Sequence, residues 1–180
     1  MAKGKKMKLF IASSSSRRGL VEAFRRELAA QADIFGIALD IQPWYRDVAR
    51  PGEDILTALT NHCRGKADDK INASDFFAAF LTDDDLRRKG GGEKAGQTVS
   101  VPRDNVIFEL GFFLGGLGFD LRRCFMLCTV PNTALPSDLE GRTYIKVELP
   151  EGSSPSDYGD AVQPAAATVI RQIYELKEVR

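Results

Sequence analysis

The sequence has few of the residues that several common kinds of functional site require. Its 180 residues include one histidine, His62, and three cysteines. A single histidine without a plausible serine or cysteine elbow argues against a catalytic triad, and no cysteine or histidine spacing is typical of a zinc site. The cysteine count is odd, and Cys124 and Cys128 lie four residues apart in an expected strand. We therefore expect reduced cysteines in the core and no metal site.

The sequence also has no excess charge of either sign and no long apolar run. Lysine and arginine together number 25, as do aspartate and glutamate, and the two signs are interspersed. A basic surface for nucleic acid is therefore not expected. Nowhere do about 18 apolar residues follow one another, and the apolar residues behind the first lysines are too few for a secretory signal. These absences predict a cytoplasmic chain that has neither nucleic acid nor a membrane as partner.

Apolar segments with strand-like and helix-like patterns alternate along the sequence and predict a single α/β domain. A chain of this length is long enough to form one. A strand, a loop and a helix follow one another twice, first from residue 8 to Gln31 and then from residue 37 to about Leu59. Residues 75–82 form the continuous apolar run of a strand covered on both faces. Further strands are expected at 123–130 and 144–147, a helix at 161–177, and a flexible loop at about 86–101. This alternation is typical of a flavodoxin-like, doubly wound parallel sheet of about five strands in the order 2-1-3-4-5.

Glu109 is the only charged residue between Asn105 and Phe119, in a segment that is otherwise apolar or glycine. Desolvating an unpaired carboxylate is costly, so such a residue usually has a partner or a use. Four glycines follow it, and glycine costs about 1 kcal/mol relative to alanine in a helix, which indicates close approach by a ligand or a backbone. We predict a helix, capped by Asp104 or Asn105, that forms one wall of a site. The alternative is a core helix whose glutamate reaches a surface arginine or caps a neighbour.

Further candidates follow the expected strands, because ligands of such sheets bind beyond the carboxyl ends of the strands. The hydroxyls of Ser13, Ser14 and Ser15, with the first N–H groups of the next helix, could hold a phosphate, and Arg17 and its neighbour Arg18 add positive charge. The alternative is that the serines only form a turn and cap the helix. The glycine-rich residues 91–98 are similar to a phosphate-binding loop but have Gln97 in place of its lysine, so we interpret them as flexible.

Trp44 and Asp83 complete the candidate site. Trp44, the only tryptophan, follows a strand end and could stack on an aromatic ring, or could instead pack its loop onto the core. Asp83, Asp84 and Asp85 are consecutive and do not converge on one metal ion without an unusual loop. We interpret these three residues as a solvated strand terminus, with Asp83 able to reach a hydroxyl group.

The segment RDNVIFELGFF, residues 103–113, resembles the signature of bacterial TIR-like, predicted nucleotide-binding proteins, which are effectors in anti-phage cyclic-nucleotide signalling systems. The similarity covers nearly the whole chain and includes FIASSS at 10–15, QPW at 42–44, LTDDD at 81–85 and LPSDLEG at 135–141. It implies a TIR-like fold and an NAD+ glycohydrolase, with NAD+ as substrate and no cofactor. Glu109 would be the catalytic glutamate, and Trp44 would lie beside the nicotinamide pocket.

The same resemblance implies partners. Proteins of this kind join the TIR-like domain to a sensor, often a STING-like or other receptor for a cyclic oligonucleotide, and gain activity by self-association. We therefore expect a sensor that is either fused to this domain or a separate chain.

A single carboxylate can catalyse the cleavage of NAD+, without a second carboxyl group as acid. An O-glycosidase usually needs a second, protonated carboxyl group for its leaving group, whereas the nicotinamide of NAD+ is already cationic and departs neutral. Two alternatives stay open. The segment Phe108-Glu109-Leu110-Gly111 also resembles the catalytic segment of nucleoside deoxyribosyltransferases, in which the glutamate attacks the sugar covalently. The chain could also be a non-catalytic interaction domain.

Overall fold

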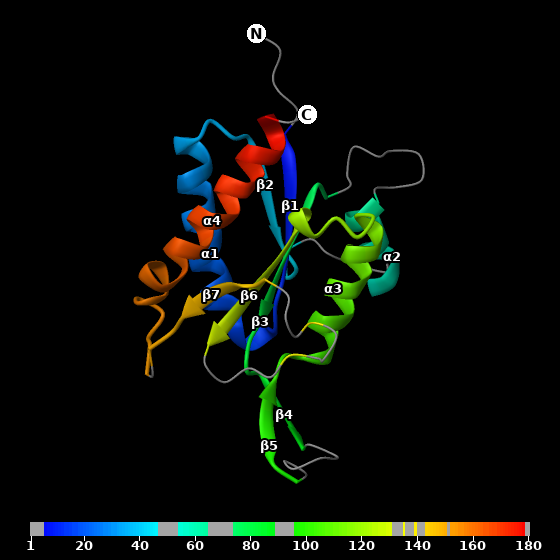
Figure 1. Ribbon diagram of the computed structural model, residues 1–180, viewed down its shortest axis with the longest axis vertical. Coiled ribbons are helices and arrows are strands. Elements are labelled where there is room, and N and C mark those ends of the chain that lie inside the picture. Colours follow the sequence, from blue (N-terminus) through cyan, green and yellow to red (C-terminus); the bar gives the residue numbers. More distant parts are fainter. Residues whose placement is uncertain are drawn as a thin grey trace.

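The computed structural model shows a five-stranded parallel sheet between two layers of helices (Figure 1). It describes residues 6–46, 54–64, 74–88, 96–130, 135, 139, 143–150 and 152–178. The strands of this sheet are β1 (Met7–Ala12), β2 (Leu39–Pro43), β3 (Phe76–Leu81), β6 (Cys124–Val130) and β7 (Ile145–Glu148). Their spatial order is β2-β1-β3-β6-β7. Numbered within the sheet this is 2-1-3-4-5, so the predicted flavodoxin-like order is confirmed.

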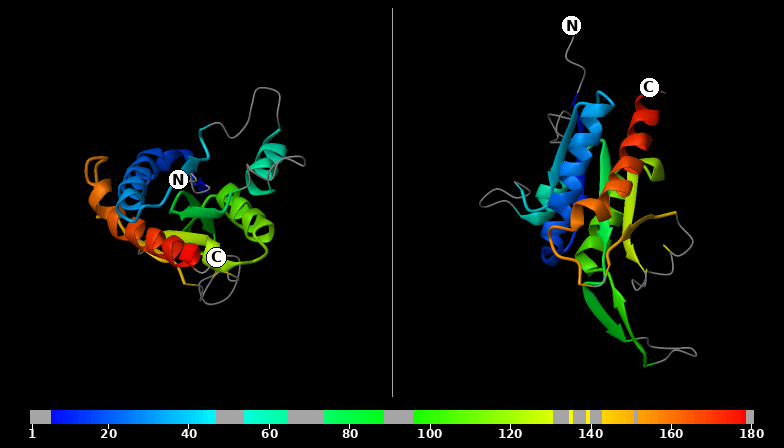
Figure 2. Two further views of the ribbon diagram at one scale, coloured as in Figure 1. Left: turned by 90° about the horizontal axis from the view of Figure 1, so that it is seen from above. Right: turned by 90° about the vertical axis from the view of Figure 1, so that its left-hand side faces the viewer.

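Helices in the described part of the chain cover both faces of the sheet. They are α1 (Arg18–Ile34), α2 (Ile55–Arg64), α3 (Asp104–Gly116) and α4 (Tyr158–Glu178), with short 3-10 helices η1 (Ser15–Arg17) and η3 (Leu121–Arg123). Viewed along the strands, α1 and α4 lie on one side of the sheet, and α2 and α3 lie on the other (Figure 2, left). The strands and helices expected from the sequence are thus confirmed, with ends shifted by a few residues.

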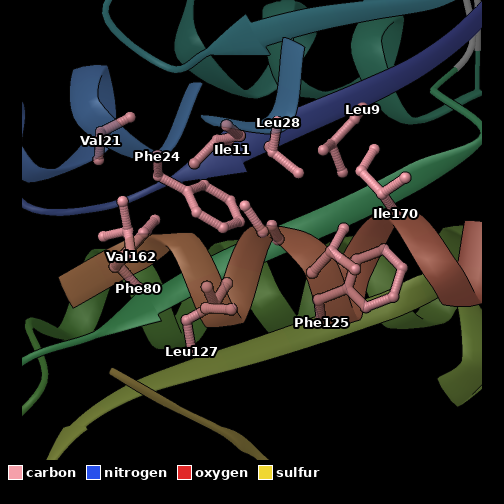
Figure 3. Close-up of a cluster of buried hydrophobic side chains, with 14 of the residues drawn as sticks. Leu9, Ile11, Val21, Phe24, Leu28, Phe80, Phe125, Leu127, Val162 and Ile170 are labelled. Carbon is pink, nitrogen blue, oxygen red and sulfur yellow. The ribbon is translucent and has the colours of Figure 1, made fainter. Parts of the chain in front are cut away.

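Side chains of the strands alternate between two hydrophobic clusters, as the pleat of a strand requires. Leu9 and Ile11 belong to the cluster beneath α1 and α4, part of which is drawn in Figure 3. Phe10 and Ala12 belong to the cluster beneath α2 and α3. All 6 side chains of β3 are buried, which confirms that this strand is covered on both faces.

A stack of three phenylalanines fixes α3 on the sheet. Phe113 of α3 stacks on Phe10 of β1 and on Phe77 of β3, with ring centroids 4.9 and 4.3 Å apart. All three side chains are 0% exposed. Each such ring contact stabilises the fold by about 0.5–1.5 kcal/mol beyond the contribution of the buried apolar area. Glu109 lies four residues before Phe113, about one helical turn away. The stack therefore holds the segment that carries Glu109 against the sheet.

Part of the expected flexible loop is a β-hairpin. β4 (Asp85–Arg88) and β5 (Thr98–Val101) pair in an antiparallel ladder and project beyond the carboxyl edge of the main sheet (Figure 1). The loop prediction is wrong for these two strands, because four-residue strands separated by glycines give too short an alternating pattern to be detected. Residues 89–95, which include most of the glycine-rich segment, lie outside the described residues.

The predicted cap of α3 is also wrong. The helix begins at Asp104 with Arg103 as its N-cap residue, and no side-chain hydrogen bond caps it. The carboxylate of Asp104 instead accepts a hydrogen bond of 2.7 Å from Arg87 of β4. This partner is 17 residues away, in the hairpin that was not expected. The charge of Asp104 still lies in the first turn, where it favours the helix dipole.

Two expectations about composition can be compared with the structure. Cys63, Cys124 and Cys128 are free and buried, so the prediction of reduced core cysteines is confirmed. In the described part of the chain, no helix combines the length and the apolar character needed to cross a membrane.

Gly116→Ala should destabilise the domain. A Cβ atom at this position would lie 1.9 Å from the sulfur of Cys63 and 3.6 Å from its Cβ. Overpacking of this kind should lower the free energy of unfolding by about 1–3 kcal/mol, measured by urea denaturation. In a Cys63→Ala background the sulfur is gone, so the same substitution should be nearly neutral. An equal cost in both backgrounds would contradict this packing.

Candidate functional site

The predicted site residues other than Glu109 lie in loops at the carboxyl edge of the main sheet. These loops follow β1, β2 and β3, which are neighbours in the sheet. In a doubly wound fold this edge is where ligands bind. Hydrogen bonds between the loops, described below, bring their side chains into direct contact.

Trp44 and Ser13 are hydrogen-bonded to each other. The indole Nε1–H of Trp44 donates to Ser13 Oγ at 3.2 Å, and the backbone N–H of Trp44 donates to the carbonyl of Ile11 at 2.9 Å. Trp44 is partly buried and packs against the cluster beneath α2 and α3. The indole is thus anchored to the core, as the packing alternative proposed, while part of it stays accessible at the carboxyl edge.

The serines after β1 do not cap a helix through their side chains. Neither Ser14, the residue before η1, nor Arg17, the residue before α1, makes a side-chain capping hydrogen bond. Ser14 is 2% exposed, and its hydroxyl lies 2.7 Å from that of Ser16. Ser15 is exposed. The capping part of the alternative is therefore wrong, whereas the turn is confirmed, because the N–H of Arg17 donates to the carbonyl of Ser14 at 3.2 Å.

Arg17 and Asp83 are paired. Arg17 Nη2 donates to Asp83 Oδ1 at 2.7 Å, and Arg17 Nε lies 3.3 Å from Asp84 Oδ1. The second contact is an ion pair without hydrogen-bond geometry, so Arg17 Nε is buried with no hydrogen-bond partner among the residues that the structure describes. The charge of Arg17 is therefore shared by two carboxylates, so an anion that binds this guanidinium must compete with Asp83.

Asp84 is not part of a solvated strand terminus. Its side chain is 2% exposed, and it accepts hydrogen bonds from Thr82 Oγ1 and, at 2.7 Å, from Ser16 Oγ. Burial alone would raise the pKa of Asp84, but hydrogen bonds from Thr82 and Ser16 and the nearby charge of Arg17 outweigh it and lower the pKa. The prediction of a solvated terminus is wrong here, because Ser16 and Arg17 are distant in sequence. Asp84 thus joins the loops after β1 and β3.

Glu109 has no hydrogen bond or ion pair with any residue in the described part of the chain. Its side chain is partly buried on α3, and burial raises its pKa to about 7. No surface arginine or helix end engages it among these residues, as the core-helix alternative would require. A carboxyl group whose desolvation is not compensated by a partner is typical of functional sites.

Helix geometry places Glu109 on the side of α3 that faces α2. Glu109 and Gly116 are seven residues apart, close to two full turns, and so lie on one side of the helix. Gly116 lies against Cys63 of α2, whose sulfur is also 4.0 Å from the carbonyl oxygen of Phe112. Glu109 is two turns nearer the carboxyl edge of the sheet than this contact. Trp44 packs against the hydrophobic cluster on this same face, so both residues lie on one side of the sheet.

The glycines after Glu109 are explained only in part by close approach. Gly116 makes room for Cys63, and Gly118 has a positive φ of 70° where the chain leaves α3. A Cβ on Gly111 or Gly115 would have no described atom within 4 Å. Packing and a turn thus account for two of these glycines without a ligand.

Two surface hollows lie away from these loops. One, of about 650 Å³, is lined by β7 and α4 residues such as Lys146 and Asp160. The other, of about 460 Å³, includes Phe125 and Gln172. Neither is lined by a predicted site residue, so neither supports the predicted site. No group of three or more potential metal ligands occurs among the residues that the structure describes.

Comparison with known proteins identifies the family. A family model described as the TIR domain of the CAP12/Pycsar effector protein matches residues 8–149. CD-NTase-associated protein 12 of Sphingobacterium faecium is 29% identical over 141 residues, which cover 78% of this chain and 36% of that protein. Pycsar effector protein BcPycTIR of Burkholderia cepacia is 27% identical over 176 residues, which cover 97% of this chain and 50% of that protein.

A third relative gives the same result. Pycsar effector protein PaPycTIR of Pseudomonas aeruginosa is 34% identical over 113 residues, which cover 61% of this chain and 31% of that protein. The chain spans half or less of the length of these relatives. Because the family model matches most of its residues, this chain belongs to the family of CAP12/Pycsar effector TIR domains.

Proposed function

We propose that this domain cleaves the N-glycosidic bond of NAD+, releasing nicotinamide and either linear ADP-ribose, by addition of water, or cyclic ADP-ribose, by attack of the ADP-ribose on its own ribose carbon, with Glu109 as the catalytic residue. One observation carries the proposal. Glu109 is partly buried, has no partner among the described residues, and has a pKa raised to about 7 by burial. Keeping such a group costs stability, which supports a role in chemistry. Membership in a family of effector TIR domains supports the same conclusion.

The reaction suits a single carboxylate. When the bond between ribose C1′ and the pyridinium nitrogen breaks, its electron pair neutralises the nitrogen, so the leaving group needs no proton. The ribose carbon becomes cationic, and a carboxylate beside it stabilises that charge. Water then adds to the carbon and loses a proton, which Glu109 can accept, because a pKa of about 7 suits a general base near neutral pH. The cationic substrate itself would favour the ionised form of Glu109.

The loops at the carboxyl edge would bind the rest of NAD+. Trp44 would stack on one of the bases. The exposed Ser15, its neighbours Ser13 and Ser14, and the uncapped amino end of α1 would hold the diphosphate. On substrate binding, Asp83 would release the guanidinium of Arg17 and accept a hydrogen bond from a ribose hydroxyl instead. The positive charge of Arg17 would then be free to bind the diphosphate. NAD+ would be a substrate and not a resident cofactor.

We further propose that activity appears on self-association. A sensor for a cyclic oligonucleotide, either fused or separate, would drive it in anti-phage defence. The relatives are two or more times as long as their aligned segments. Those proteins are therefore long enough to contain a sensor domain in addition to the aligned segment.

The test is to incubate the purified chain with NAD+ and, separately, with a deoxynucleoside, and to follow free base by chromatography. We expect nicotinamide from NAD+ and no base from the deoxynucleoside. Concentrated and artificially clustered samples are needed, because a dilute sample would not reveal activity that depends on self-association. Base from the deoxynucleoside alone would favour a deoxyribosyltransferase-like enzyme. No base from either, even when clustered, would favour an interaction domain.

A further inference from the structure

Glu22 of α1 is the centre of a hydrogen-bond cluster that the proposed reaction does not use. Its carboxylate accepts from Tyr45 Oη at 2.7 Å, from Arg46 Nη2 at 2.9 Å and from Arg25 Nε at 2.9 Å. Burial alone would raise the pKa of Glu22, but the hydrogen bonds from Tyr45 and Arg25 and the charges of Arg25 and Arg46 outweigh it and lower the pKa. Glu22 is therefore an ionised anchor for the residues that follow β2.

A second contact from α1 holds the ring of Tyr45. The guanidinium carbon of Arg18 lies over this ring, 4.4 Å from its centroid, a distance at which a cation is attracted to the face of an aromatic ring. Arg18 is four residues before Glu22, so both side chains lie on one side of α1. Tyr45 is thus held by α1 at its face and at its hydroxyl.

Tyr45 and Trp44 lie on opposite faces of the sheet. Tyr45 packs against the hydrophobic cluster beneath α1 and α4, and Trp44 packs against the one beneath α2 and α3. Their rings meet edge to face, with centroids 5.7 Å apart and planes at 88°. A tight turn fixes the backbone between them, because the N–H of Arg46 donates to the carbonyl of Pro43 at 2.9 Å. Movement of Tyr45 would therefore move Trp44.

We propose that Glu22 is a positioning residue that fixes the Trp44 indole through Tyr45 and Arg46. Glu22 lies on the face of the sheet opposite to α3, so its hydrogen bonds reach Trp44 through the turn after β2. The consequence for catalysis rests on the proposed function: if Trp44 stacks on NAD+, loss of the anchor weakens substrate binding and leaves the chemistry at Glu109 intact. KM should rise several-fold while kcat changes little.

The test uses Trp44 as its own reporter, because it is the only tryptophan in the chain. Glu22→Ala removes the anchor, and Tyr45→Phe removes only one hydroxyl from it. Glu27→Gln, on the same helix, is the matched control, since Glu27 has no hydrogen bond or ion pair with any described residue. Tryptophan emission and its quenching by acrylamide report the environment of Trp44 without requiring activity, and thermal unfolding verifies that each variant is folded.

We expect red-shifted emission, stronger quenching and a raised KM in Glu22→Ala and Tyr45→Phe, and no change in Glu27→Gln. Unchanged Trp44 emission in both folded variants would overturn the proposal. Altered emission with an unchanged KM would support the positioning of Trp44 by Glu22 and would overturn its consequence for substrate binding. If clustered wild-type protein releases no nicotinamide, the proposed function fails, and the fluorescence comparison alone decides whether Glu22 positions Trp44.

Discussion

Glu109→Gln should lower the rate of nicotinamide release from NAD+ by about 100- to 10,000-fold, the range typical for loss of a positioned acid–base or charge-stabilising group. The amide is nearly the same size as the carboxyl group, but it cannot carry the negative charge that opposes a ribosyl cation. The measurement is kcat and KM for NAD+ in clustered protein, with nicotinamide quantified by chromatography. The loss should appear in kcat, because the charge on the ribose develops in the transition state.

Two further variants separate the effect of the charge at residue 109 from that of removing any carboxylate. Glu109→Asp keeps the charge but withdraws it by one methylene, so it should retain more activity than the amide. Glu175→Gln removes a carboxylate from the exposed side of α4 and should leave the rate unchanged. Undiminished nicotinamide release from a folded Glu109→Gln protein would exclude this residue from the mechanism.

The sheet could be predicted because its strands carry their own signal. Residues 76–81 are apolar without interruption, which only a strand covered on both faces explains in so short a segment. The alternation of strands and helices then indicates a doubly wound parallel sheet, for which 2-1-3-4-5 is the flavodoxin-like order. Glu109 could be singled out as a candidate for a similar reason: one charge in an apolar helix is visible without knowledge of its neighbours.

The contacts around the site could not be predicted, because their partners are distant in sequence. Arg17 and Asp83 are 66 residues apart, and Glu22 and Tyr45 are 23 apart. A run of three aspartates resembles a solvated terminus until the fold brings Ser16 and Arg17 to Asp84. The role of Glu22 was missed because glutamates on an amphipathic helix are usually solvent-exposed, and no local pattern distinguishes one that anchors a loop.

The cost of keeping Glu109 should be measurable as a stability difference that depends on pH. Burial raises the pKa of Glu109 from its ordinary value of 4.5 to about 7 in the folded chain. Between these values the folded state holds a proton that the unfolded state has lost, so the free energy of unfolding falls as pH rises through this window and levels off above it. The amide of Glu109→Gln does not titrate, so the free energy of unfolding of this variant does not show this fall with pH.

The stability advantage of Glu109→Gln over the wild type should therefore grow by about 2.5 kcal/mol between pH 5 and pH 8, given 1.36 kcal/mol for each unit of pKa difference. Urea denaturation of both proteins at each pH provides the measurement, and the difference between them cancels the titration of all other groups. Glu175→Gln should show no growth. A constant difference for Glu109→Gln would mean that its carboxyl group is compensated in the folded state. Growth together with loss of activity would show that the domain keeps a destabilising charge where its chemistry needs one.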